Sequence, residues 1–226
     1  MRRIYLAIFL VSCSALIFEV SLIRFFSIYL SHHFAFMVIS IAMLGIGSAG
    51  TALSVYHVRK QLPLYELHNN TKDNENNPPS PPFSKGGMGG FSGINSRASV
   101  YAMLAGISII FGYIASNNVS FDPVKLSWDW TQILYIALYC FALSIPFFFT
   151  GILIATAFST QSEKSEFIYS ADLFGAGIGS LSVLGLLNIA APEYAILTAS
   201  LLCFIASFIT DGKNMKWFVS FLIIVN

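Results

Sequence analysis

The sequence predicts an all-helical integral membrane protein, a polytopic bundle of six transmembrane helices plus a partial seventh at the C-terminus. Hydrophobic residues make up 56% of the 226 residues, charged residues only 10%, and the mean hydropathy is +0.71. An ordinary soluble domain carries roughly 25% charged residues. Several apolar stretches also approach the roughly 20 residues that a helix needs to cross a bilayer. These observations exclude a soluble globular protein.

The charge balance and the cysteines exclude further classes. Twelve Lys and Arg residues against eleven Asp and Glu residues give a net charge of +1, so the chain lacks the basic excess with which nucleic-acid binders neutralise phosphates. The lipid bilayer is the expected partner, and nucleic acid is not. Cys13, Cys140 and Cys203 lie far apart in apolar runs without C-x-x-C spacing. We therefore expect no metal site and no cofactor.

Residues 1–56 are predicted to form a transmembrane hairpin. One apolar stretch runs from Ile4 to Leu30, interrupted only by Glu19 and Arg24, and a second runs from Phe34 to Tyr56. The short link Ser31-His32-His33 joins them. Two adjacent histidines on a turn lack the i, i+4 spacing of a helical metal site, so we interpret them as solvated.

Residues 57–98 are predicted to be a disordered cytoplasmic loop, which resembles an insertion. This segment is rich in Asn, Pro, Ser, Gly and Lys, and it includes the run Pro78-Pro79-Ser80-Pro81-Pro82. Such a composition buries too little apolar area to offset the entropy lost on ordering.

Residues 99–210 are predicted to hold spans three to six. The apolar stretches are Val100–Ala115, Ile133–Phe158, Phe167–Ala190 and Tyr194–Ile209. Pro146 removes one backbone donor from the fourth span and is expected to kink it. Residues 217–226 begin another apolar stretch of about half the length of a crossing. We expect this stretch to be a truncated seventh span.

The distribution of Lys and Arg predicts the orientation. With Arg2 and Arg3 in the cytoplasm and the spans alternating, most basic residues of the connecting segments also fall inside, and Lys125 falls outside. This positive-inside pattern predicts a cytoplasmic N-terminus. An alternative is a lipoprotein signal peptide cleaved before Cys13, as in Leu10-Val11-Ser12-Cys13. The apolar run continues past Cys13 to Phe26, which favours an uncleaved span.

Glycine-rich segments in two spans predict close helix packing. Gly45-Ile46-Gly47-Ser48-Ala49-Gly50 reads as G-x-G-x-x-G, but a dinucleotide site needs a preceding strand within a βαβ unit. Gly175 and Gly179 form G-x-x-x-G, a pattern typical of helix contacts in membranes. We therefore predict that Gly45, Gly47, Gly50, Gly175 and Gly179 contact neighbouring helices.

Two acids within the spans define a candidate intramembrane polar site. A carboxylate in hydrocarbon costs about 2.5 to 3.5 kcal/mol on insertion scales, so Glu19 needs a partner, water or a proton. Arg24 is five residues away, about 140° around the helix, and is not that partner. Asp172 is expected to lie about 15 Å from Glu19 in depth, so the two acids should not pair directly. They either line a polar route between helices or hydrogen-bond to neighbouring helices.

Four blocks of sequence, in order, resemble the membrane domain of the bacterial membrane-bound spermidine synthase-like proteins. The first is Ser14-Ala15-Leu16-Ile17-Phe18-Glu19-Val20 followed by Arg24, and the second is Leu44-Gly45-Ile46-Gly47-Ser48. The third is Pro146-Phe147-Phe148-Phe149-Thr150-Gly151, and the fourth is Tyr169-Ser170-Ala171-Asp172-Leu173-Phe174-Gly175-Ala176. The resemblance covers most of residues 1–56 and 99–210. It places Glu19, Arg24, Pro146, Tyr169 and Asp172 at recurring positions of that membrane domain without assigning their roles.

The resemblance implies a bacterial inner-membrane protein that is a membrane half without its enzyme. In that family an aminopropyltransferase-like domain, with a glycine-rich nucleoside-binding turn, follows the membrane helices, and no segment after Ile209 matches it. We therefore expect a catalytically silent membrane anchor or partner, truncated or split from an aminopropyltransferase-like domain. Two alternatives remain open: a transporter or channel for small solutes such as polyamines that uses Glu19 and Asp172, and an inactive gene remnant.

Overall fold

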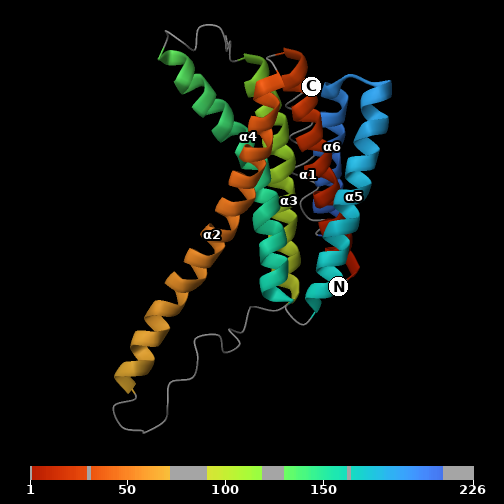
Figure 1. Cartoon of the computed structure of the whole chain (residues 1–226). Helices are drawn as coiled ribbons and strands as arrows, with labels where there is room; N and C mark the ends of the chain where they lie inside the picture. Colours follow the sequence, from red (N-terminus) through yellow and green to blue (C-terminus); the bar gives the residue numbers. More distant parts are fainter. Residues whose placement is uncertain (1, 30–31, 72–90, 119–129, 162–163, 211–226) are drawn as a thin grey trace.

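The structure is a computed structural model, and it describes residues 2–29, 32–71, 91–118, 130–161 and 164–210. Every element in these ranges is a helix: α1 (Arg2–Tyr29), α2 (His32–Thr71), α3 (Phe91–Asn118), α4 (Thr131–Thr160), α5 (Ser165–Ile189) and α6 (Pro192–Thr210). Figure 1 shows the helices running alternately up and down in one bundle, from which the second half of α2 leans away.

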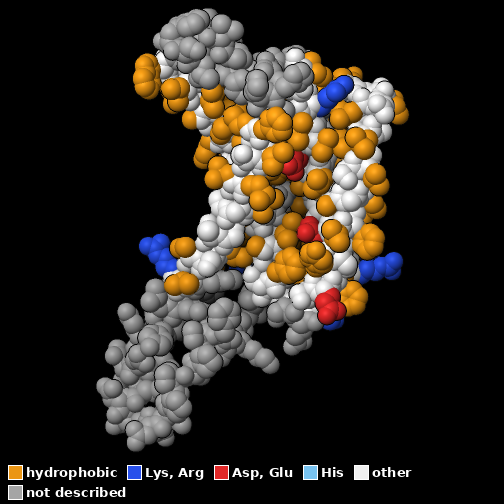
Figure 2. Space-filling model, in the orientation of Figure 1, with side chains coloured by type: hydrophobic (Ala, Val, Ile, Leu, Met, Phe, Trp, Pro, Cys, Tyr) orange, Lys and Arg blue, Asp and Glu red, His pale blue; other side chains and the backbone are white. Residues whose placement is uncertain are grey.

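Each of the six helices is long and apolar enough to cross a membrane. Each also leaves large hydrophobic side chains on the outside of the bundle, such as Phe36 on α2, which is 72% exposed, and Leu181 on α5, which is 71% exposed. Figure 2 shows hydrophobic side chains covering most of this face. Water would penalise such a surface, whereas lipid tails are as apolar as the side chains themselves. The fold is therefore that of a multi-pass membrane bundle.

The first helix is the centre of the bundle. It packs most extensively on α5 and α6 and also contacts α2, α3 and α4. The remaining contacts form a chain in which α2 packs on α4, α4 on α3, and α3 on α6. In contrast, α5 packs mainly on α1 and makes few contacts with α4 or α6.

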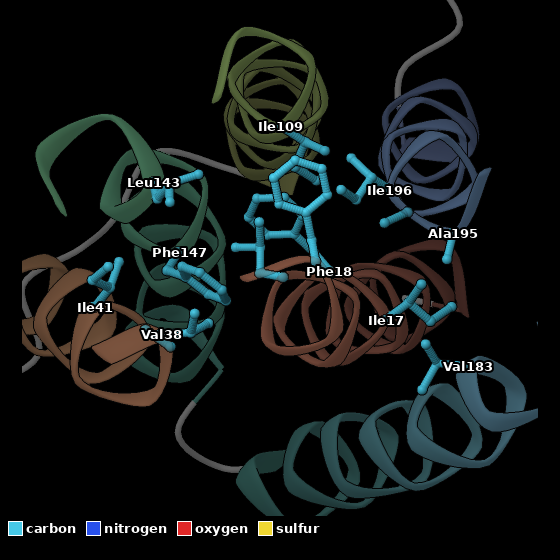
Figure 3. Close-up of a cluster of buried hydrophobic side chains, with 14 of the residues drawn as sticks. Ile17, Phe18, Val38, Ile41, Ile109, Leu143, Phe147, Val183, Ala195 and Ile196 are labelled. Atoms are coloured by element: carbon cyan, nitrogen blue, oxygen red, sulfur yellow. The ribbon is translucent and has the colours of Figure 1, made fainter. Parts of the chain in front are cut away.

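Aromatic and branched side chains fill the interior around α1. Phe18 of α1 is 1% exposed, and its ring lies 5.4 Å from that of Phe147 on α4, measured between centroids. Figure 3 shows Phe18 directed toward Ile109 of α3 and Ile17 directed toward Val183 of α5. Since water is absent from both the core and the lipid, the helices are held together by the packing of these side chains and by close and polar contacts between helices.

Both ends of the loop predicted for residues 57–98 are helical in the structure. The second helix continues to Thr71 and α3 begins at Phe91, so both spans extend beyond the membrane-length stretches inferred from hydropathy. Outside the hydrocarbon a helix needs no apolar face, because it pairs its own backbone groups, and hydropathy therefore underestimates its length. The Pro- and Gly-rich centre of the predicted loop, residues 72–90, lies outside the described residues, as does the predicted seventh span at 217–226.

The fourth helix is continuous across Pro146. In Figure 1, α4 changes direction along its length, so that its first part leans away from α3. Pro146 lies midway along α4, where its ring removes one backbone hydrogen bond.

Candidate intramembrane polar site

The contact between α1 and α5 contains the first polar group of the site. Ser12 of α1 is 2% exposed, and its hydroxyl donates a hydrogen bond to Oδ1 of Asp172 on α5. The sequence placed Asp172 in the membrane without a named partner. The structure assigns it an interhelical serine, which is one of the two roles that we considered for a buried acid.

Glycine brings α1 and α5 close enough for this hydrogen bond. A Cβ added at Gly179 would lie 2.5 Å from the carbonyl oxygen of Cys13, and one added at Gly175 would overlap the backbone of Phe9. Both glycines are buried. Ile168, Asp172, Gly175, Gly179 and Val183 recur at intervals of three and four, so they share one face of α5. Only hydrogen atoms separate the two backbones here.

Glu19 lies on α1 two helical turns beyond Ser12. Its side chain is half-buried, and among the described residues it has neither a hydrogen bond nor an ion pair. Ser12 and Glu19 are seven positions apart, which corresponds to about 10.5 Å along the axis and nearly the same face. Because Asp172 bonds to Ser12, the two acids occupy different depths and do not pair directly.

The structure does not place Arg24 and Tyr169, the other predicted members of the site, beside Ser12 and Asp172. Arg24 is exposed on the outside of α1, and no ion pair joins it to Glu19 within the described part of the chain. Tyr169 is 60% exposed, because it lies at the edge of the α5 face that contacts α1. The four residues therefore do not form a single cluster.

The predicted glycine contacts on α2 are found at one of three positions. A Cβ added at Gly45 would lie 2.6 Å from Cβ of Phe147 and 2.6 Å from the carbonyl oxygen of Ser144, so this glycine packs on α4. Gly47 and Gly50 have no atom within 4 Å of such a Cβ, and the prediction that they pack is not supported. At 100° per residue they lie about 200° and 140° from Gly45, on the opposite side of α2.

Sequence reasoning missed several further polar contacts inside the bundle. Ser14 of α1 donates to the carbonyl oxygen of Ala199 on α6 at 2.6 Å, and its oxygen is 3.1 Å from Sγ of Cys203. Ser99 of α3 and Ser207 of α6 hydrogen-bond to each other's carbonyl oxygens at 2.9 and 2.8 Å. The signal was present in the sequence, since single serines within apolar spans often mark helix interfaces.

Another missed contact lies at one end of the bundle. The hydroxyl of Tyr5 on α1 donates to Oε1 of Gln161, directly after α4, over 3.3 Å. Both residues are half-buried. Tyr5 is seven positions before Ser12, so it shares the α1 face that carries Ser12 and Glu19.

Nothing in the described residues forms a metal centre. No group of three or more His, Cys, Asp or Glu side chains within these ranges could hold a metal ion. The hydroxyl and carboxyl groups of this site can donate and accept hydrogen bonds and exchange protons. Comparison of the chain with protein-family models, curated proteins and solved structures finds no match.

Proposed function

We propose that the chain is a catalytically silent, multi-pass inner-membrane domain, with its N-terminus in the cytoplasm, that anchors or assists a spermidine synthase-like aminopropyltransferase domain. One observation carries this proposal: the sequence blocks that resemble that family are used as helix-packing surfaces. Gly45 of the second block packs on Phe147 of the third, and Gly175 of the fourth packs on α1 at Phe9, five residues before the first block.

A packing role suits an anchor better than an enzyme. Gly151 of the third block also lies against α2, where an added Cβ would be 2.8 Å from Cβ of Ala49. Residues engaged in backbone contacts of this kind set the shape of a domain, whereas aminopropyl transfer needs a pocket for a nucleoside and an amine. The lipid-facing surface supplies the anchoring.

The experiment that tests the proposal has two steps. The transcript is first sequenced beyond codon 226 in all frames, to look for a glycine-rich nucleotide-binding domain. That domain is then expressed with a tag, with and without the chain, and membranes are separated from cytosol. We expect the domain in the membrane fraction only when the chain is present. The absence of such a domain, an unchanged distribution, or aminopropyl transfer by the purified chain alone would overturn the proposal.

A second candidate function is a carrier or channel for small cations, including polyamines. It is favoured by Glu19, a half-buried carboxyl on a membrane-spanning helix without a partner among the described residues. Intramembrane acids commonly mark ion or substrate routes.

Polyamine uptake into proteoliposomes tests this candidate. Uptake of radiolabelled putrescine and spermidine is compared for the native chain, for Glu19→Gln and for the double variant Glu19→Gln, Asp172→Asn. Glu166→Gln serves as a control, because Glu166 lies in the first turn of α5, away from the face of α1 that carries Ser12 and Glu19. This candidate predicts that the Glu19→Gln variant and the double variant lose uptake, whereas Glu166→Gln keeps the uptake of the native chain. Equal uptake by all variants contradicts it.

A further inference from the structure

The packing order of the helices repeats after α3. The first helix, α1, packs most extensively on α5 and α6, and α4 packs most extensively on α2 and α3. The first helix of each half of the chain therefore packs on the last two helices of the other half, and α3 packs on α6. Figure 1 shows the helices running alternately up and down, so α1 and α4 run in opposite directions. This is the pattern of an inverted repeat, in which a two-fold axis in the membrane plane relates α1–α3 to α4–α6.

Close contacts relate the two halves residue by residue. In each half, two small residues four positions apart on the second helix lie against the first helix of the other half. The contacts are Gly45 with Phe147 and Ala49 with Gly151, and Gly175 with Phe9 and Gly179 with Cys13. Between the small residues, Gly47 and Gly177 have no atom within 4 Å of an added Cβ. The packed and unpacked faces of α2 thus recur on α5 at one constant offset in sequence.

These contacts divide the bundle into two bodies. The first body is α1 with α5 and α6, and the second is α4 with α2 and α3. Each is held together by its central helix, α1 or α4, and the contacts with α5 and α2 are so close that an added Cβ would overlap its neighbour. Interiors packed in this way have discrete arrangements and do not deform gradually. Each body is therefore expected to move as one unit.

The two bodies meet most extensively at α3 and α6. Ser99 and Ser207 each donate a hydrogen bond to the carbonyl oxygen of the other, and Ser200 donates one to the carbonyl oxygen of Gly106. The repeat relates α3 to α6, so this contact remains the same when the halves are exchanged, as a pivot between them must.

Two other contacts between the bodies break the symmetry. The repeat relates the pair α1 and α2 to the pair α4 and α5, yet α1 packs on α2, whereas α4 and α5 make few contacts. The length of the connections does not explain the difference. One connection joins Tyr29 to His32 and the other joins Thr160 to Ser165, so both pairs are hairpins with short links. One hairpin is closed in the structure, and its counterpart is open.

Glu19 lies at the boundary between the two halves. The first helices of the halves, α1 and α4, meet where the ring centroids of Phe18 and Phe147 are 5.4 Å apart. Glu19 follows Phe18, is half-buried and has no partner among the described residues. Transporters built from inverted repeats bind their substrates at the repeat boundary near the middle of the membrane. A carboxyl group at this place suits a cation, because it forms charge-assisted hydrogen bonds with amines.

We propose that the two bodies rock on the contact between α3 and α6, exchanging the packing of α1 on α2 for the packing of α4 on α5. The structure is one of the two states, and the other is its counterpart with the halves exchanged. Because that exchange also interchanges the two sides of the membrane, the two states open toward opposite sides. The inference rests on the second candidate function and deepens it: the chain is an alternating carrier of small cations and not a channel.

Distances between pairs of spin labels, measured by pulsed electron resonance on the full chain in lipid nanodiscs, test the proposal. The three native cysteines are replaced by serine, and labels are attached at cysteines introduced at exposed positions. Leu6 with Val55 reports on α1 and α2, and Leu138 with Leu184 reports on α4 and α5. Leu6 with Leu184 is the matched control, because it uses the same positions within one body. Thermal unfolding of each labelled chain monitors folding.

The expected result is two coupled distances in both test pairs. A rotation of about 15° over the roughly 15 Å from the middle of the membrane to its edge moves a helix end by about 4 Å. The shorter distance between Leu138 and Leu184 should occur in the same fraction of molecules as the longer distance between Leu6 and Val55. Putrescine should shift both fractions together, and Glu19→Gln should remove that shift. The control pair should keep one distance.

Two results would overturn the proposal: a single distance in both test pairs with and without putrescine, or fractions that change independently of each other. The outcome is separate from that of the uptake assay. Uptake by a chain with a single set of distances would retain the second candidate function as a channel and reject rocking. Two coupled states in a chain without polyamine uptake would retain rocking and reject polyamines as the solute.

Discussion

The contact between Gly179 and α1 makes a quantitative prediction about stability. A Cβ at position 179 would lie 2.5 Å from the carbonyl oxygen and 2.9 Å from Cα of Cys13. Ordinary van der Waals contacts begin near 3.4 Å, so Gly179→Ala must move the two helices apart by about 0.9 Å. The obstructing atoms are backbone, which cannot rotate away as the end of a side chain can.

The expected cost follows from two terms. Overpacking of a close contact costs about 1 to 3 kcal/mol, and stretching the Ser12–Asp172 hydrogen bond adds about 0.6 kcal/mol, the average for such bonds in membrane bundles. We therefore expect Gly179→Ala to lower the free energy of unfolding by about 1.5 to 3.5 kcal/mol, which is roughly a 10- to 400-fold change in the unfolding equilibrium.

Gly177→Ala is the matched control for this substitution. It lies on the same helix, two residues away, and an added Cβ there meets no atom within 4 Å. The same change of glycine to alanine should therefore stay within about 0.5 kcal/mol of the native chain or stabilise it slightly. Unfolding in mixed micelles with increasing SDS, followed by tryptophan fluorescence, measures both. Equal stabilities for the two variants would refute the contact between α1 and α5.

Three further substitutions, the first with a matched control, test other parts of the bundle by the same unfolding assay. Phe18→Ala removes a ring that is 1% exposed and should lower the free energy of unfolding by about 3 to 5 kcal/mol. Its control, Phe174→Ala, removes a ring that is 68% exposed and should leave that free energy almost unchanged. Similar losses for the two variants would contradict the described core. Ser14→Ala loses its bond to the carbonyl oxygen of Ala199 and should cost about 1 kcal/mol, and a stabilised variant would argue against that bond. Gly45→Ala overlaps Phe147 and should cost about 1 to 3 kcal/mol; an unchanged midpoint would exclude the contact between α2 and α4.

The sequence predicted the spans well because the physics of crossing a bilayer is local. Each helix must pair its own backbone groups and present apolar side chains over a fixed length, and both requirements can be read from a short window. All six predicted spans coincide with helices in the structure. The extension of α2 to Thr71 was missed because that part of the helix has no apolar period to reveal it.

The candidate site was less predictable, because it depends on which faces of different helices meet. Asp172 was found as a buried acid, but its partner Ser12 is 160 residues away, and no single window relates them. Gly45 and Gly47 look equivalent in the motif, yet only Gly45 faces α4. The row formed by Tyr5, Ser12 and Glu19 could have been recognised from its spacing of seven, although its partners could not.

Disulfide cross-linking tests the register of α1 on α5 most directly, and the packing role of the motif blocks depends on it. In a chain whose three native cysteines are replaced by serine, Ser12→Cys is combined with Asp172→Cys, and the membranes are treated with a mild oxidant. The contact between these side chains predicts rapid, nearly complete cross-linking. Ser14→Cys with Asp172→Cys should remain uncrosslinked, because Ser14 faces α6. Cross-linking of the second pair but not the first would contradict the account.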